Sequence, residues 1–176
     1  MKKFSTKRLL SWVAVAAWMV VIFLFSAQTG KDSGDTSGRI LRLVMKLLYW
    51  NFEDFSPLRQ ESLMAVWGVI VRKGAHFTEY AVLGALLCNA LRNYDLSGKL
   101  RWLLPVGIGG LYAVTDEIHQ YFVPERACRL LDMGIDTTGV LCGTAVFFGI
   151  VYLLKKKSSL ALNCPSLYGQ HKKAPM

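Results

Sequence analysis

The sequence predicts an all-α integral membrane protein with four transmembrane helices and an extracytoplasmic amphipathic helical segment between the first and second of them. Two observations carry this prediction. Hydrophobic residues make up 53% of the 176 residues and charged residues only 19%, whereas about a quarter of an ordinary globular chain is charged. The apolar residues are also grouped in runs long enough to cross a hydrocarbon core of about 30 Å.

Four apolar stretches have the length of roughly 20 residues that a membrane-spanning helix needs. The first contains no charged residue and is long for the apolar region of a signal peptide, so we expect an uncleaved anchor. The other three carry ionisable residues only near one end. The predicted spans are residues 9–27, 75–91, 102–123 and 133–154.

The predicted external segment, residues 28–74, divides into a loop and two helices. Small and polar residues at 33–38 predict the loop, and helical periodicity follows over 39–49, with Ile40 and Val44 opposite Arg42 and Lys46. Such a helix either lies in the membrane interface or packs on the spans, and the pattern fits both. The Ser-Pro pair at 56–57 predicts the start of another helix that leads into the second span.

The distribution of charge predicts that both termini are cytoplasmic. With that orientation, the cytoplasmic segments hold 12 Lys and Arg and one acid, Asp95, while the rest of the chain holds 9 Lys and Arg and 11 acids. Basic residues concentrate in cytoplasmic flanks of membrane proteins. We therefore expect one membrane domain, residues 1–154, in the bacterial inner membrane and a polar cytoplasmic tail, residues 155–176.

Composition also excludes two classes of function. The net charge of +9 is divided into short clusters beside the apolar runs, whereas a nucleic-acid surface spreads its basic residues over one face. The four cysteines have no spacing typical of a zinc site or a disulfide framework. The bilayer is the one partner that the sequence predicts directly, and it indicates no oligomeric state.

Polar residues of the last three spans should meet near the outer membrane surface. Ionisable groups inside membrane segments are costly and are usually functional. Gly139 and Gly143 would let another helix approach the fourth span closely. The predicted centre of the site is Glu79, Asp116, His119, Asp132 and Asp136, and its predicted substrate-binding partners are Lys73, His76, Glu117, Gln120 and Arg126.

Three interpretations of this set remain open. In one, His119 or Glu79 transfers a proton while Asp116 orients the imidazole. In another, basic residues such as Lys73 and Arg126 merely neutralise the acids and fix helix packing. In the third, a divalent metal is bound through pairs at i, i+3 spacing, as in carboxylate-rich helical bundles. The metal ligands would be His76, Glu79, Asp116, His119, Asp132 and Asp136.

Three sequence blocks carry a resemblance to a known family. They are KGAHFTEYAVLG at 73–84, DEIHQYFVPER at 116–126, and DMGIDTTG at 132–139 followed by Gly143. Together with FSAQ at 25–28, they resemble the VanZ-like membrane family, except that Asp136 stands where many members are expected to have asparagine. The resemblance implies a four-span bacterial envelope protein, and the name-giving member is associated with teicoplanin resistance.

The predicted function is therefore binding of, or action on, a cell-envelope or lipid-linked substrate from outside the cell membrane. The resemblance implies, in addition, a contribution to glycopeptide resistance of the teicoplanin type. Two alternatives are a proton-coupled transporter and a non-catalytic structural partner of an envelope complex. The cytoplasmic halves of the spans contain almost no ionisable residues, which argues against a proton path through the membrane.

Overall fold

The computed structural model describes residues 6–126 and 128–162, and over these residues it contains only helices. The prediction of an all-α protein is confirmed. The elements are α1 (Thr6–Ser26), α2 (Gly30–Leu48), the short 3₁₀ helix η1 (Phe52–Asp54), α3 (Pro57–Leu91), α4 (Gly98–Tyr121) and α5 (Leu130–Leu162). The predicted spans 75–91 and 133–154 lie wholly within α3 and α5, whereas 9–27 and 102–123 extend one and two residues beyond the ends of α1 and α4.

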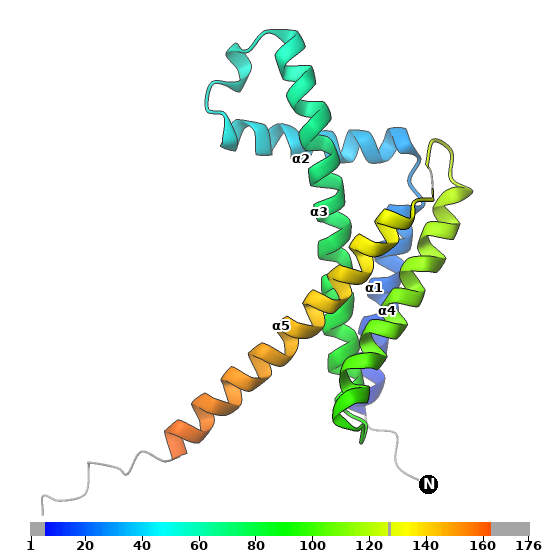
Figure 1. Cartoon of the computed structure of the whole chain (residues 1–176), viewed down its shortest axis with the longest axis vertical. Helices are drawn as coiled ribbons and strands as arrows, with labels where there is room; N and C mark the ends of the chain where they lie inside the picture. Colours follow the sequence, from blue (N-terminus) through cyan, green and yellow to red (C-terminus); the bar gives the residue numbers. More distant parts are fainter. Residues whose placement is uncertain (1–5, 127, 163–176) are drawn as a thin grey trace, which may run out of the picture.

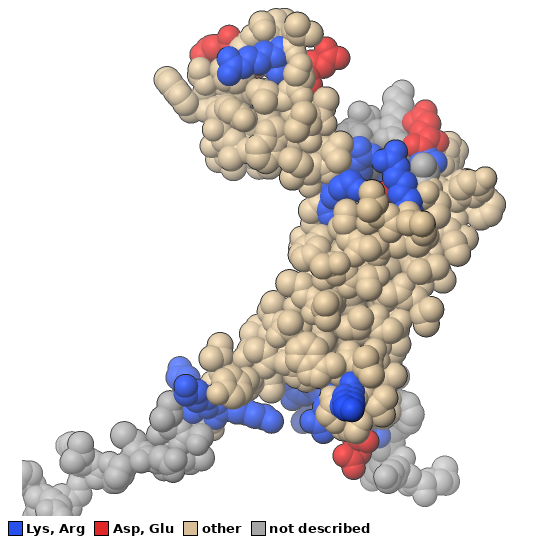
Figure 2. Space-filling model, in the orientation of Figure 1, with Lys and Arg blue, Asp and Glu red and all other residues tan. Residues whose placement is uncertain are grey.

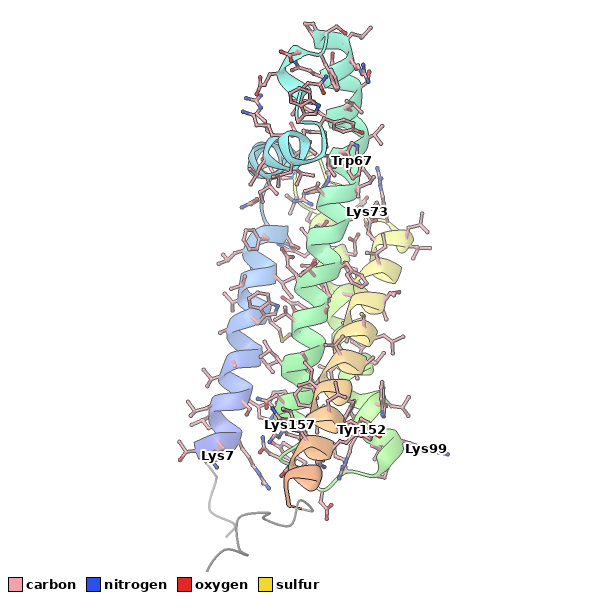
Figure 3. The ribbon with its side chains drawn as sticks, turned by 90° about the vertical axis from the view of Figure 1, so that its left-hand side faces the viewer. Lys7, Trp67, Lys73, Lys99, Tyr152 and Lys157 are labelled. Carbon is pink, nitrogen blue, oxygen red and sulfur yellow. The ribbon has the colours of Figure 1, made fainter. Side chains whose placement is uncertain are left out.

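Helices α1, α3, α4 and α5 form a bundle, and α2 lies across one end of it (Figure 1). The first half of α3 projects beyond the bundle and carries α2 and η1. Lys7, Lys99 and Lys157 lie at the opposite end of the molecule from Lys73 and the α2 region (Figure 3). Between the two charged ends, the face shown in Figure 2 has a wide band without Lys, Arg, Asp or Glu.

Within the described part of the chain, two helices are long and apolar enough to cross a membrane. They are α1 and the segment Leu130–Ser158 of α5. Large apolar side chains stay exposed on both, for example Val20 and Leu24 on α1 and Ile150 and Leu153 on α5, as lipid-facing helices require. The polar residues predicted to form the site lie on α3, α4 and the start of α5, and they lower the hydropathy of α3 and α4.

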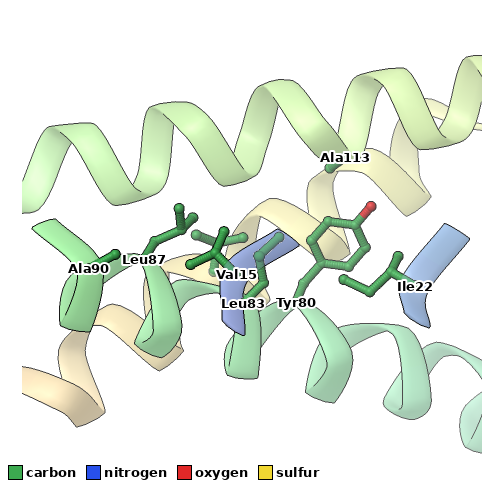
Figure 4. Packing of buried hydrophobic residues seen from close by; sticks show 8 residues of the cluster. Val15, Ile22, Tyr80, Leu83, Leu87, Ala90 and Ala113 are labelled. Carbon is green, nitrogen blue, oxygen red and sulfur yellow. The ribbon is translucent and has the colours of Figure 1, made fainter. Parts of the chain in front are cut away.

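A buried apolar cluster joins the four helices of the bundle (Figure 4). Half of its members come from α3, which makes α3 the central helix. The remaining members come from the other three helices, so each contributes at least one buried side chain. The cluster consists of Val15, Ile22, Tyr80, Leu83, Leu87, Ala90, Ala113 and Val140.

Glycines allow α3 and α5 to cross with their backbones in contact. A Cβ atom at Gly139 would overlap the carbonyl oxygen of Phe77, and one at Gly143 would overlap that of Ala81. A Cβ atom at Gly84 on α3 would overlap the carbonyl oxygen of Val140. The predicted use of Gly139 and Gly143 for close helix approach is therefore confirmed, and the partner helix is α3.

Helix α2 differs from its prediction at its N-terminal end. The segment 33–38, predicted as a loop, is helical, because α2 begins at Gly30; once the turns after residue 38 are formed, adding a helical residue costs less than starting a helix. Leu41 and Met45 are buried with Phe52 against the first half of α3, while Leu47 remains exposed. The helix thus packs on the protein and still presents a second apolar side.

Helix α3 begins where the sequence predicts, and α5 ends later than the predicted span. Ser56 is the N-cap of α3 and Pro57 occupies its first turn, as predicted. Helix α5 continues to Leu162, so the predicted polar tail begins as a helix. The remainder of that tail, 163–176, lies outside the described residues.

The glycine contact gives a first prediction. We expect Gly143→Val to prevent the native approach of α5 to Ala81. The free energy of unfolding should fall by about 1–3 kcal/mol, the usual cost of overpacking. Gly149→Val is the matched control, because nothing lies within 4 Å of a Cβ atom at Gly149. The melting temperatures of both variants in detergent, with size-exclusion chromatography as the readout of folded protein, measure the difference in stability. Equal melting temperatures would contradict this packing.

Candidate functional site

A pocket of about 170 Å³ lies where α3, the last turns of α4, the α4–α5 link and the start of α5 meet. Basic side chains come from α3 and the link, and acidic side chains come from α4, α5 and the link. Basic residues are visible at this end of the bundle in Figure 2. The predicted site residues that line the pocket are Lys73, His76, Glu117, Gln120, Arg126, Asp132 and Asp136.

One ion pair bridges the pocket between α3 and α5. The Lys73 ammonium group donates a hydrogen bond to Asp132, and both side chains are partly exposed. The pair lies at the same end of the two helices as Gly139, so the close helix crossing brings its partners together. Lys73 thus neutralises one acid, as the structural interpretation requires.

Glu117 lines the pocket and also holds the α4–α5 link in place through a hydrogen bond. Its side chain is buried, and one carboxylate oxygen accepts a hydrogen bond of 3.0 Å from the backbone N–H of Arg129. Glu125 in the same link has a positive φ of 61°, in the left-handed region that few non-glycine residues adopt. This turn lets the chain reverse between α4 and α5 while Arg126 and Arg129 face the pocket.

Three arginines of the pocket have no carboxylate partner among the side chains that the structure describes. No Asp or Glu oxygen of those side chains lies within 4 Å of the guanidinium nitrogens of Arg72, Arg126 or Arg129. Arg126 donates from Nε to the backbone oxygen of Gln28 at 3.3 Å. Burial, and secondarily the charge of Arg72, lower the pKa of Arg126, while nearby acids oppose this. An anionic ligand would therefore stabilise the charged guanidinium groups.

A buried polar network joins α1 to α4 beside the pocket. The Ser26 hydroxyl donates to Asp116 Oδ2 at 2.7 Å, and the Gln120 amide donates to both Ser26 Oγ and Asp116 Oδ2 at 3.1 Å. The exposed fractions are 0% for Ser26, 3% for Asp116 and 4% for Gln120. Sequence reasoning missed Ser26 as a site residue, although it belongs to the FSAQ block that carried part of the resemblance.

Three predicted central residues do not line the pocket: Glu79, Asp116 and His119. The His119 ring packs against Phe23 of α1, with ring centroids 4.5 Å apart. No hydrogen bond between Asp116 and His119 is present in the described part of the chain. Asp116 Oδ2 accepts from Ser26 and Gln120, and Asp116 Oδ1 has no partner among the described residues. The structure thus divides the predicted set into a pocket group and a second group beside α1.

Several buried polar atoms of both groups lack a partner. Buried polar groups in proteins are nearly always hydrogen-bonded, so these atoms are available to a ligand, a water molecule or a proton. Those without a hydrogen-bond partner within residues 6–126 and 128–162 include His76 Nδ1, Glu79 Oε2, Tyr80 OH, Asp116 Oδ1, His119 Nδ1 and Asp136 Oδ1.

The six residues proposed as metal ligands do not form a preorganised metal site. Within the described segments, no group of three or more His, Cys, Asp or Glu side chains has a geometry that could hold a metal ion. His76 Nδ1 and Glu79 Oε2 lie 3.9 Å apart, and the Lys73 ammonium group binds Asp132.

Comparison with known proteins identifies the family. A sequence model of the family described as VanZ/LLP1 matches residues 11–154, which include nearly all of α1, all of α2, α3 and α4, and most of α5. No curated protein sequence and no solved structure shows significant similarity to the chain. The family match includes every residue of the pocket and of the buried network, and the chain therefore belongs to the VanZ/LLP1 family.

Proposed function

We propose that this VanZ-like protein spans the bacterial cell membrane four times and binds the phosphate-bearing head of a lipid-linked cell-envelope intermediate at its outer surface. The observation that carries the proposal is the pocket with three arginines, Arg72, Arg126 and Arg129, that have no carboxylate partner among the described side chains. The planar guanidinium group matches phosphate in charge and in hydrogen-bond geometry.

The proposed topology is supported by the arrangement of the helices. Because α3 and α4 pack beside α1 and α5, the two less apolar helices occupy the same depth as the two strongly apolar ones (Figure 1). Both described chain ends and the α3–α4 loop lie at one basic end (Figure 3). Basic flanks favour the cytoplasm, which puts the pocket on the extracytoplasmic side.

The size of the pocket favours a headgroup over a whole soluble substrate. Pockets for drug-sized ligands are typically about 300–1,000 Å³, whereas this one is about 170 Å³. Val69 and Ile135 add apolar surface to its wall. A phosphate or pyrophosphate would fit among the arginines, while the lipid chain would leave along the apolar surface of the helices.

If a reaction follows binding, we assign its proton transfer to His76 and Asp136. Both side chains line the pocket, and each has a buried polar atom without a partner. Asp136 is only 1% exposed, which limits competition from solvent water. Glu79 and His119, the acid–base residues preferred from the sequence, lie off the pocket wall and would act on the ligand only indirectly.

The first test removes one arginine. We expect Arg126→Gln to weaken binding of a short-chain polyprenyl phosphate about 10- to 100-fold, because charge-assisted hydrogen bonds contribute about 1.5–3 kcal/mol. Arg59→Gln is the matched control, since Arg59 lies outside the pocket, near the start of α3, and contacts the Phe55 ring. Titration of the purified protein in detergent measures the dissociation constants. Unchanged binding by the Arg126 variant would refute the phosphate site.

The second test concerns function in cells, including the link to glycopeptide resistance. We expect His76→Gln and Asp136→Asn to abolish any protection against teicoplanin or other envelope-directed drugs that the wild-type protein confers on a susceptible host. Asp136→Asn keeps the shape of the side chain and His76→Gln keeps a hydrogen-bonding nitrogen, and both substitutions remove the ability to exchange a proton or carry a charge. Immunoblotting of membranes controls for insertion. Full protection by both variants would favour the structural-partner alternative.

Transport is less well supported than binding. Towards the cytoplasmic end, the bundle centre is filled by apolar side chains such as Leu83, Leu87 and Ala90 (Figure 4). A proton path would need polar groups or water there. Proton flux into vesicles containing the protein would distinguish the transporter, and we expect the same flux as in protein-free vesicles.

A further inference from the structure

A second pocket, of about 290 Å³, lies at the opposite end of the bundle from the first. It is formed where the end of α3, the start of α4 and the later turns of α5 meet. Its basic residues are Arg92, Arg101 and Lys155, one from each of these regions. None of them belongs to the candidate functional site.

The described side chains do not neutralise the positive charge of this pocket. Among them, no carboxylate lies within ion-pair distance of Arg92, Arg101 or Lys155, and Asp95 in the adjacent loop forms no ion pair. Arg101 donates from Nε to the Leu96 carbonyl oxygen at 3.0 Å. This bond restrains the side chain and leaves the terminal guanidinium nitrogens available for an anion.

The rest of the pocket wall is apolar and aromatic. Phe147, Phe148 and Val151 line it from α5. The Phe148 ring stacks on Trp102 with centroids 4.8 Å apart and meets Phe147 edge-to-face at 5.8 Å. A ligand that satisfies both parts of the wall must carry a negative head and a hydrocarbon chain.

We propose that this pocket binds an anionic phospholipid of the phosphatidylglycerol class from the cytoplasmic leaflet. Arg92, Arg101 and Lys155 contact its phosphate, and an acyl chain packs against Phe148 and its apolar neighbours. Three uncompensated cations favour a lipid with net negative charge over a zwitterionic one, whose ammonium group they would repel. The proposal requires that this end lie at a membrane surface, but it does not depend on the ligand of the outer pocket.

The general excess of basic residues on cytoplasmic flanks does not account for the pocket. Exposed lysines anywhere on the cytoplasmic flanks would be enough to produce that excess. Lys99, Lys156 and Lys157 lie in the same regions of α4 and α5 and are exposed, as Arg92, Arg101 and Lys155 are, but they do not line the pocket. They therefore provide a control with matched charge.

Native mass spectrometry of the detergent-purified full chain, titrated with phosphatidylglycerol or phosphatidylcholine, tests the proposal. We expect wild-type protein to retain phosphatidylglycerol preferentially, and the double variant Arg92→Gln/Arg101→Gln to bind it about tenfold less. The control Lys99→Gln/Lys156→Gln removes the same charge and should bind like wild type. Lys155→Gln alone, which disturbs no hydrogen bond of the described structure, should also weaken binding and serves if the double variant fails to fold.

Three results would overturn the proposal. Equal retention of the two lipids by wild type would show that net charge is not recognised. Equal losses in the pocket variants and in the lysine control would show that only the overall charge of the surface matters. Complete displacement of the lipid by low-millimolar inorganic phosphate would show that the apolar wall contributes nothing to binding.

Discussion

The backbone contact between α3 and α5 is the constraint on which the rest of the structure depends. Hydrophobic exclusion from water does not drive helices together inside a bilayer, so close packing of small residues must do so. At Gly84, Gly139 and Gly143 there is no room for even a Cβ atom between the two helices. The position of α5 along α3 is consequently fixed, and with it the pairing of Lys73 with Asp132 at the mouth of the pocket.

A different kind of contact fixes α1 and α4. Ser26 at the last turn of α1 binds Asp116 and Gln120 in a site that water hardly reaches. Gln120 also lines the pocket, so the network that holds α1 in position supports one wall of the proposed ligand site. Asp116 thereby joins α1 to α4, which is the kind of contact that the structural interpretation of the polar residues expects. The unpaired arginines and the unpartnered atoms of His76 and Asp136 remain for a ligand.

The sequence predicted the helices well because their length and periodicity are local properties. The first span was expected at 9–27 and α1 is Thr6–Ser26, and Ser56 caps α3 as its position before a proline indicates. Gly139 and Gly143 were also identified correctly, since four-residue spacing puts both on one face of a helix. The start of α2 was wrong because glycine and serine discourage a helix only weakly once a neighbouring segment is helical.

The composition of the pocket was harder to predict because it depends on how far each helix is rotated about its own axis. Helical spacing groups residues on a face but does not say which face meets the partner. Glu117, expected to assist, is a buried wall of the pocket, whereas His119, expected at the centre, packs on Phe23. Ser26 was missed because nothing local in the sequence shows that the end of the first span meets Asp116 and Gln120 on α4.

Cross-linking across the mouth of the pocket tests the central claim most directly. In a cysteine-free background, Lys73→Cys and Asp132→Cys should be joined by a short bifunctional thiol reagent in native membranes, because the two side chains contact each other. The yield should fall sharply when Gly143→Val is added, and Arg59→Cys paired with Asp132→Cys should give no product. Efficient cross-linking of the Lys73 and Asp132 positions regardless of the residue at 143, or none in any background, would contradict the claim that the glycine contact sets the pocket.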